Sequence, residues 1–190
     1  MGLLILGVVL FIGIHSISII NEGLRDRLAA KFGEMGWKGL YSVISIIGFV
    51  LLIYGYGQAR QNPIVLYNSP AWLHYINYFL MLFVFQLFLA ANFPGKIKAM
   101  AKHPLLAATK IWAFAHLLVN GTVADVILFG SFLAWAVMDR ISMKHRTQRP
   151  IMAMPASGLN DIICVVVGLG LYAAFFVWLH ASWIGVGLPM

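Results

Sequence analysis

Apolar segments of membrane-spanning length dominate this chain. Charges, prolines and glycines separate them, and they cover about residues 3–20, 40–56, 72–91, 104–119, 123–138 and 161–180. A bilayer core about 30 Å thick requires about 20 apolar residues per spanning helix. The sequence therefore predicts an all-α integral membrane helical bundle with about six transmembrane helices.

The composition favours the same class. Hydrophobic residues make up 62% of the 190 residues and charged residues 10%, against about 45–50% and about 25% in soluble proteins. Six helices with short loops use up this length, so we expect one membrane domain over residues 1–190. Cys164 is the only cysteine, which excludes an intramolecular disulfide and a multi-cysteine metal site. The net charge of +7 does not indicate nucleic-acid binding, because the basic residues flank apolar segments, where topology explains them.

Basic residues alternate between the loops. The loops at about 21–39, 92–103 and 139–160 are rich in Lys and Arg, whereas the intervening loops and the tail hold almost none. Under the positive-inside rule, the rich loops are cytoplasmic and both termini lie on the outer, periplasmic side of an inner membrane. The first segment lacks a basic start and a cleavage site, so we expect a retained helix. The fourth and fifth segments are short, and a re-entrant hairpin around Asn120 and Gly121 is an alternative to two crossings.

Five of the six histidines lie in or at the ends of apolar segments, where ionisable groups are costly and indicate function. The predicted topology places His15 and His103 in the inner leaflet. His116 follows His103 on the same segment, about 20 Å further along a helix, and shares the outer level with His74 and His180. For any one membrane histidine, the alternative is a hydrogen-bonded packing residue.

Two imidazoles in one leaflet favour haem over zinc. Zinc takes four ligands, and the inner-leaflet carboxylates lie only in or beside loops. Haem needs one or two axial ligands, which paired histidines on different helices supply. Lys110 lies two turns beyond His103 on the same helical face. Its cation would pair with a haem propionate or with Asp125 on the neighbouring segment.

Other patterns indicate packing rather than chemistry. Gly168 and Gly170 match a dinucleotide fingerprint as text, but no strand precedes them, so helix packing through small residues explains them better. The small residues Ser42, Ser45 and Gly48 predict a close-packing helix face. The adjacent Asp139-Arg140 pair is expected to anchor the fifth helix at the inner interface.

A series of ordered motifs covers most of the first 146 residues and is densest at 93–146. The motifs are His15-Ser16, Gly36-Trp37-Lys38-Gly39-Leu40-Tyr41-Ser42, Phe93-Pro94-Gly95, Lys102-His103-Pro104-Leu105, Lys110-Ile111-Trp112-Ala113-Phe114-Ala115-His116-Leu117-Leu118-Val119-Asn120-Gly121, Leu128-Phe129-Gly130 and Asp139-Arg140. Together they resemble the NnrU family of bacterial membrane proteins.

The resemblance implies a link to denitrification, in particular to nitric oxide and nitrite reduction. A plant relative, zeta-carotene isomerase, shares the domain and uses haem b bound by histidines in a redox-dependent cis–trans isomerisation. Carried over to this chain, the resemblance implies His15 and His103 as haem ligands, with His116 as the other candidate. The Gly-Gly that follows the His-Ser pair in the isomerase is Ile17-Ser18 here, and the long plant insertions are missing. Haem binding is therefore the more transferable property.

We expect a multi-pass inner-membrane protein that binds haem b through His15 and His103, with Lys110 near the porphyrin, and acts in nitric oxide and nitrite metabolism. As an enzyme it would be a haem-dependent isomerase or oxidoreductase acting on a small gas or an apolar substrate. Two other classes remain open. One is a non-enzymatic assembly or regulatory factor for a respiratory reductase, docking through loop 139–160. The other is a small transporter with a polar path through Lys110, Asp125 and Gln86. Protein partners would be a second copy of the chain or the reductase.

Overall fold

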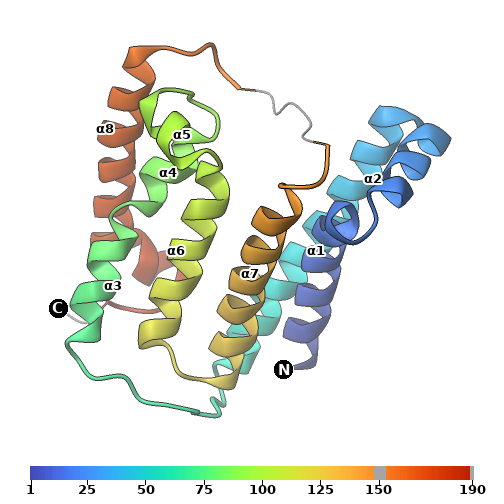
Figure 1. The fold of residues 1–190 in the computed structure, drawn as a ribbon. Helices are drawn as coiled ribbons and strands as arrows, with labels where there is room; N and C mark the ends of the chain where they lie inside the picture. Colours follow the sequence, from blue (N-terminus) through green and yellow to red (C-terminus); the bar gives the residue numbers. More distant parts are fainter. Residues whose placement is uncertain (148–152, 189–190) are drawn as a thin grey trace. The chain divides into compact units, whose positions relative to one another are not determined.

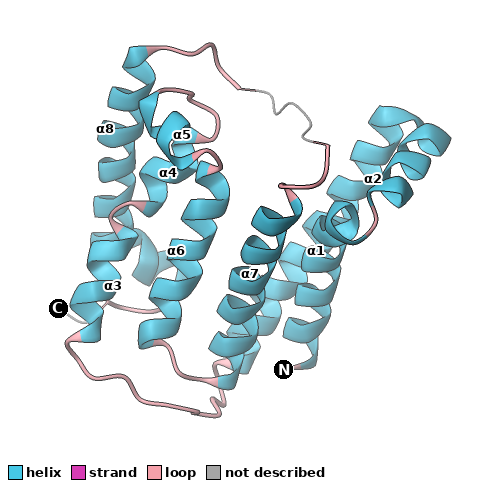
Figure 2. Cartoon of the chain, in the orientation of Figure 1, coloured by secondary structure: helices cyan, strands magenta, loops and turns pink. Residues whose placement is uncertain are grey.

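The computed structural model describes residues 1–147 and 153–188, and the chain divides into two compact units. Unit 1 comprises Met1–Asn68 and Asn120–Gln148, and unit 2 comprises Ser69–Val119 and Arg149–Met190. Figure 1 follows the chain through them. The regular secondary structure of the described residues is helical, as Figure 2 shows, with a single isolated β-bridge between Val65 and Thr122. The all-α prediction is confirmed.

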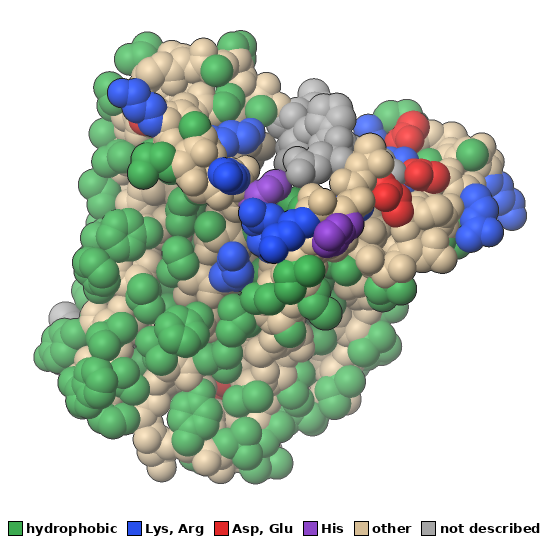
Figure 3. Space-filling view, viewed as in Figure 1, with side chains coloured by type: hydrophobic (Ala, Val, Ile, Leu, Met, Phe, Trp, Pro, Cys, Tyr) green, Lys and Arg blue, Asp and Glu red, His purple; other side chains and the backbone are tan. Residues whose placement is uncertain are grey.

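Four helices of the described residues are long and apolar enough to cross a membrane. They are Gly2–Ile20, Glu22–Ala59, Leu73–Ala90 and Gly158–Ile184, and Pro104–Val119 is a shorter apolar helix. Their side chains remain largely exposed, and Figure 3 shows hydrophobic side chains spread over the face in view. Such surfaces are stable against lipid rather than water. The structure therefore fits a membrane helical bundle, while the six crossings and the outer position of both termini stay predictions.

In unit 1, glycines bring helix α1 (Gly2–Ile20) and the long helix α2 (Glu22–Ala59) into close contact. A Cβ atom on Gly7 would meet the backbone of Leu52, and one on Gly55 would meet the backbone of Leu4. Gly48 faces the backbone of Phe11 in the same way. Small residues at such positions let two membrane helices approach closely enough for extensive van der Waals contact. The packing role predicted for Gly48 is confirmed.

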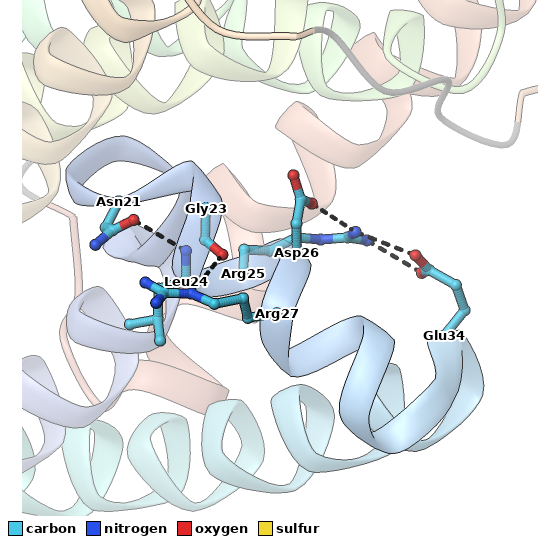
Figure 4. Close-up of polar contacts among 7 residues, drawn as sticks. All are labelled: Asn21, Gly23, Leu24, Arg25, Asp26, Arg27 and Glu34. Carbon is cyan, nitrogen blue, oxygen red and sulfur yellow. Dashed lines mark hydrogen bonds and ion pairs between the residues drawn. The ribbon is translucent and has the colours of Figure 1, made fainter.

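The first basic loop is helical rather than irregular. Helix α2 already begins at Glu22 and bends at Gly33, whose φ of 74° and ψ of 157° lie outside the helical region. Glycine adopts a positive φ at little steric cost. The guanidinium of Arg25 spans the bend, donating to both carboxylate oxygens of Glu34 at 3.1 Å each and to Asp26 at 3.2 Å (Figure 4). The loop was missed as a helix because its apolar content is low.

Helix α7 (Val123–Ser142) completes unit 1 and packs on α1. It starts at a capping box in which the Thr122 side chain and Asp125 bond each other's backbone amides. The turn before it is held by the segment 64–67, since the Gly121 carbonyl accepts from the amides of Leu66 and Tyr67 at 2.7 and 3.2 Å. A Cβ on Gly121 would collide with the Tyr67 carbonyl. Glycine is therefore required at position 121 by close packing.

Unit 2 contains the other helices. They are α3 (Leu73–Met81), α4 (Val84–Ala90), α5 (Lys96–Ala101), α6 (Pro104–Val119), α8 (Gly158–Ala174) and the π-helix η1 (Phe175–Ile184). The third predicted segment is thus interrupted at Leu82 and Phe83, and the sixth extends into a π-helix. Within the unit, α6 packs against α3 and α4, and α4 packs against α8. Gly168 of α8 lies against the backbone of Gln86, which confirms its predicted packing role, whereas a Cβ on Gly170 would meet nothing within 4 Å.

The Phe93-Pro94-Gly95 motif is a structural joint between α4, α5 and α8. Asp161 accepts hydrogen bonds from the amides of Lys96 and Ile97 at 2.8 and 2.9 Å. The side-chain amide of Asn160 donates a hydrogen bond to the Pro94 carbonyl at 2.8 Å. A Cβ on Gly95 would come within 2.5 Å of the Asp161 carboxylate, so only glycine fits. Asp161 satisfies backbone donors at the start of α5 that would otherwise lack partners.

Candidate functional site

The four predicted site residues fall in different units. His15 lies in α1 of unit 1, whereas His103, Lys110 and His116 lie on or next to α6 of unit 2. The environment of each residue is therefore defined by its own unit.

The His15 imidazole is oriented by its own helix. Its Nδ1 lies 2.6 Å from the Phe11 carbonyl oxygen. A carbonyl only accepts hydrogen bonds, so Nδ1 carries the proton and Nε2 of the neutral ring keeps its lone pair. This is the arrangement that histidine ligands of metals adopt, with one nitrogen donating to a fixed acceptor and the other facing the metal. The sequence spacing of four residues along one helix face produces it.

Aromatic rings surround His15. The Phe11 ring stacks on the imidazole with centroids 4.3 Å apart, Tyr41 lies at 5.1 Å, and Trp135 of α7 stands perpendicular at 5.9 Å. The indole Nε1 of Trp135 is buried without a hydrogen-bond partner in the described part of the chain. Buried N–H groups nearly always have a partner, so one without is a candidate donor to a ligand. Trp135 was not among the predicted site residues, because only the packing of α7 brings it to His15.

A buried ion pair lies at the same end of α7. Asp139, 6% exposed, accepts a charge-assisted hydrogen bond from Arg146 at 2.6 Å. Asp139 therefore has an ion-pair partner in Arg146, seven residues on, while the anchoring of this helix end at the inner interface by Asp139 and Arg140 stays a prediction. This ion pair fixes the first part of loop 139–160 against the end of the helix. Residues 148–152 of that proposed docking loop lie outside the described residues.

His103 follows a strained turn. Lys102 has φ 59° and ψ −49°, and the His103 amide donates to the Ala101 carbonyl at 2.6 Å. These values define a γ-turn with positive φ, which is rare and strained for a residue other than glycine. Helix α6 begins immediately afterwards at Pro104, where proline is favoured because its missing N–H is not needed. The turn thus fixes the entry of the chain into α6 at His103.

Lys110 lies within α6 and makes no hydrogen bond or ion pair with the residues that the structure describes. The sequence suggested Asp125 as a partner of Lys110, but Asp125 lies in unit 1 and both of its carboxylate oxygens accept hydrogen bonds there. One carboxylate oxygen accepts from the Tyr56 hydroxyl at 2.6 Å, and the other accepts from the Thr122 amide and hydroxyl at 2.9 and 2.7 Å. Asp125 is therefore a structural acceptor that joins the ends of α2 and α7, which argues against its place in a transport path.

Replacing Asp125 by alanine is expected to destabilise the protein by about 2–4 kcal/mol, because a buried hydroxyl and a helix-capping amide lose their acceptor. Thermal unfolding in detergent measures this. Asp26→Ala is the matched control, since the Asp26 side chain is 54% exposed and its ion pair is of the weak surface type. Equal unfolding temperatures for the two variants would contradict the assigned role.

His116 faces a cavity inside unit 2. Its Nδ1 lies 2.8 Å from the Trp112 carbonyl oxygen, which repeats the arrangement of His15 and Phe11. The cavity is half-open and lined by ten residues: Asn77, Tyr78, Met81, Phe85, His116, Tyr172, Phe175, Phe176, His180 and Leu188. His180 was not among the predicted site residues, although the predicted topology placed it at the same level as His116. In the described residues, no group of three or more His, Cys, Asp or Glu side chains could hold a metal ion.

Comparison with known proteins gives one family match. The model of the family described as NnrU protein matches residues 3–188, which is nearly the whole chain and spans both units. No curated protein matches the chain, and no solved structure matches it.

Proposed function

Since this chain belongs to the NnrU family, we propose that it is an inner-membrane protein that binds haem b and acts in the metabolism of nitric oxide and nitrite. Family membership points to a membrane protein tied to nitric oxide reductase, and the long apolar helices support a multi-pass arrangement. Beyond family membership and the multi-pass arrangement, we propose that the protein binds haem and that particular histidines are its ligands.

The observation that carries the proposal is the His15 environment. The imidazole is held by the Phe11 carbonyl with Nε2 as its basic nitrogen, and aromatic rings suited to a flat macrocycle lie on several sides. The unpartnered N–H of Trp135 offers a hydrogen bond to a bound group. This donor set fits haem, which requires one or two imidazoles rather than a cluster of four ligands.

A second ligand and a counter-charge complete the proposed haem site. His103 is our first choice for the second ligand because the γ-turn at Lys102 fixes its position, and His116 is the alternative. Lys110, which has no anionic partner in the described residues, would pair with a carboxylate of the porphyrin. Haem bound here would supply an iron centre whose reactivity toward gases or double bonds depends on axial ligands and pocket polarity. The chain's own residues orient the imidazoles, exclude water with aromatic side chains and provide the buried N–H donor.

The decisive experiment is a visible spectrum of the protein, expressed with haem supplied and purified in detergent. We expect a Soret band that shifts on reduction and on addition of nitric oxide, and that is lost when His15 and His103 are both changed to alanine. Absence of the band, or a band unchanged in the double variant, would refute the proposal. If histidine variants leave the physiological phenotype intact and removal of loop 139–160 abolishes it, the protein is instead a non-enzymatic assembly factor.

A further inference from the structure

The cavity of unit 2 contains two possible metal ligands, His180 and Met81, that the proposed haem site does not use. Five elements meet there, namely α3, α4, α6, α8 and η1. They bring His116 and His180 to one space from positions 64 residues apart in the sequence. Asn77 is 6% exposed, and its amide nitrogen donates to the Ala115 carbonyl at 2.7 Å. That bond fixes the Asn77 side chain and leaves its Oδ1 as an acceptor.

Both imidazoles are oriented in the same way. The Nδ1 atom of His180 lies 2.8 Å from the Val186 carbonyl oxygen, as that of His116 lies 2.8 Å from the Trp112 carbonyl oxygen. Each ring therefore carries its proton on Nδ1, and Nε2 is the basic nitrogen of each. Gly185, with φ 75° and ψ 22°, turns the chain back so that Val186 reaches His180. In metal sites, a hydrogen bond donated by the ring nitrogen that does not bind the metal fixes the tautomer of a histidine ligand and raises its basicity.

The backbone at this cavity is unusual. His180 and two of the aromatic walls, Phe175 and Phe176, belong to the ten-residue π-helix η1. π-Helical segments are rare in proteins. Those that do occur lie frequently at functional sites. Here η1 contributes His180 to the lining of the cavity.

The volume of the cavity indicates which class of ligand it could hold. The cavity encloses about 60 Å³, whereas sites for drug-sized molecules measure about 300–1,000 Å³. An ion with one or two bound waters fits this space. Two imidazoles among apolar walls are ligands for a transition metal.

We propose that His116, His180 and Met81 form a copper site in unit 2. Imidazole nitrogens suit several metals, but a thioether is soft and selects Cu(I), and Met81 lines the same cavity. The ligand set is neutral, and a monovalent ion costs less than a divalent one in a low-dielectric site. Asn77 is a further oxygen donor for the oxidised ion.

The test is copper titration of the full-length protein in detergent. Cu(I) affinity is measured by competition with a chromogenic Cu(I) chelator, and the ligands are identified by X-ray absorption spectroscopy. We expect one Cu(I) per chain with nitrogen and sulfur neighbours. His180→Ala should weaken binding at least about tenfold, as loss of even an outer-sphere partner weakens metal sites by about 10–100-fold. Met81→Leu should weaken Cu(I) binding more than Cu(II) binding, because only the thioether is lost.

Two control variants lie in the same unit. His74→Ala removes another histidine, and Met100→Leu removes a methionine that is 85% exposed. Neither residue lines the cavity, so both variants should bind copper as the unmodified protein does. Copper affinity that is unchanged in His180→Ala and Met81→Leu, or lowered equally by the controls, would overturn the proposal. Ag(I), which is redox-inert, serves as a second probe, and failure of Ag(I) to compete for the site would also overturn it.

This inference stands apart from the haem proposal. His180→Ala and Met81→Leu should leave the Soret band unchanged, because neither residue is a proposed haem ligand. The paired change of His15 and His103 should remove the Soret band and leave the Cu(I) stoichiometry unchanged. Failure of one proposal is thus distinguishable from failure of the other.

Discussion

Replacing Gly55 by leucine is expected to separate α1 from α2 and to destabilise the protein by at least about 3 kcal/mol, near the upper end of the cost of overpacking. The reason is that the added side chain would meet the backbone of Leu4, which cannot move aside as a flexible side chain can. Thermal unfolding in detergent, followed by circular dichroism and by size-exclusion chromatography, measures the loss.

Gly57→Leu provides the matched control. Gly57 lies on the same helix two residues further on, and a Cβ there meets nothing within 4 Å. Leucine has a higher helix propensity than glycine, so this variant should unfold at the same or a slightly higher temperature. If Gly55→Leu unfolds at the temperature of Gly57→Leu, the close contact between α1 and α2 is not present in the protein.

If haem is bound as proposed, changing His15 to alanine is expected to lower the haem content of the purified protein at least about tenfold, because the proposed imidazole ligand is lost. The Soret absorbance relative to total protein measures this effect. The same variant should recover the Soret band when free imidazole is added, since the aromatic rings of Phe11, Tyr41 and Trp135 remain around the vacated position. Recovery by imidazole separates a ligand from a residue that only supports the fold.

His145→Ala is the control for this prediction, because His145 is exposed in the basic loop after α7. Its haem content should equal that of the unmodified protein. Full haem content in His15→Ala, or the same loss in His145→Ala, would exclude His15 as a ligand and favour the interpretation of His15 as a packing residue.

The apolar segments predicted the positions of most helices. The run at 3–20 corresponds to α1, and the run at 104–119 corresponds to α6. The match is close because apolar length and flanking charges are local properties of the chain, and a helix forms its hydrogen bonds within the same segment. The packing roles of Gly48 and Gly168 were also predictable, since small residues within membrane helices usually mark contacts.

Other features depend on neighbours distant in the sequence. Nothing local distinguishes Gly33, where α2 bends, from other glycines, until Arg25 and Glu34 meet across the bend. The sequence indicated no partner for Asp139, and the turn after α7 brings Arg146 to it. Each feature results from side chains that pair after the backbone has turned, so sequence spacing alone does not reveal it.

The sequence by itself determined that this chain is a helical membrane protein of the NnrU family, and it indicated His15, His103, Lys110 and His116 as the residues to consider. Hydrophobicity and motif order are properties of the linear chain, so they needed no coordinates. Only the tertiary structure decided that Trp135 lies beside His15 with its N–H unpartnered, and that a π-helix brings His180 to the cavity of His116. Those neighbours come from separate helices, and helix packing rather than sequence distance sets which side chains meet.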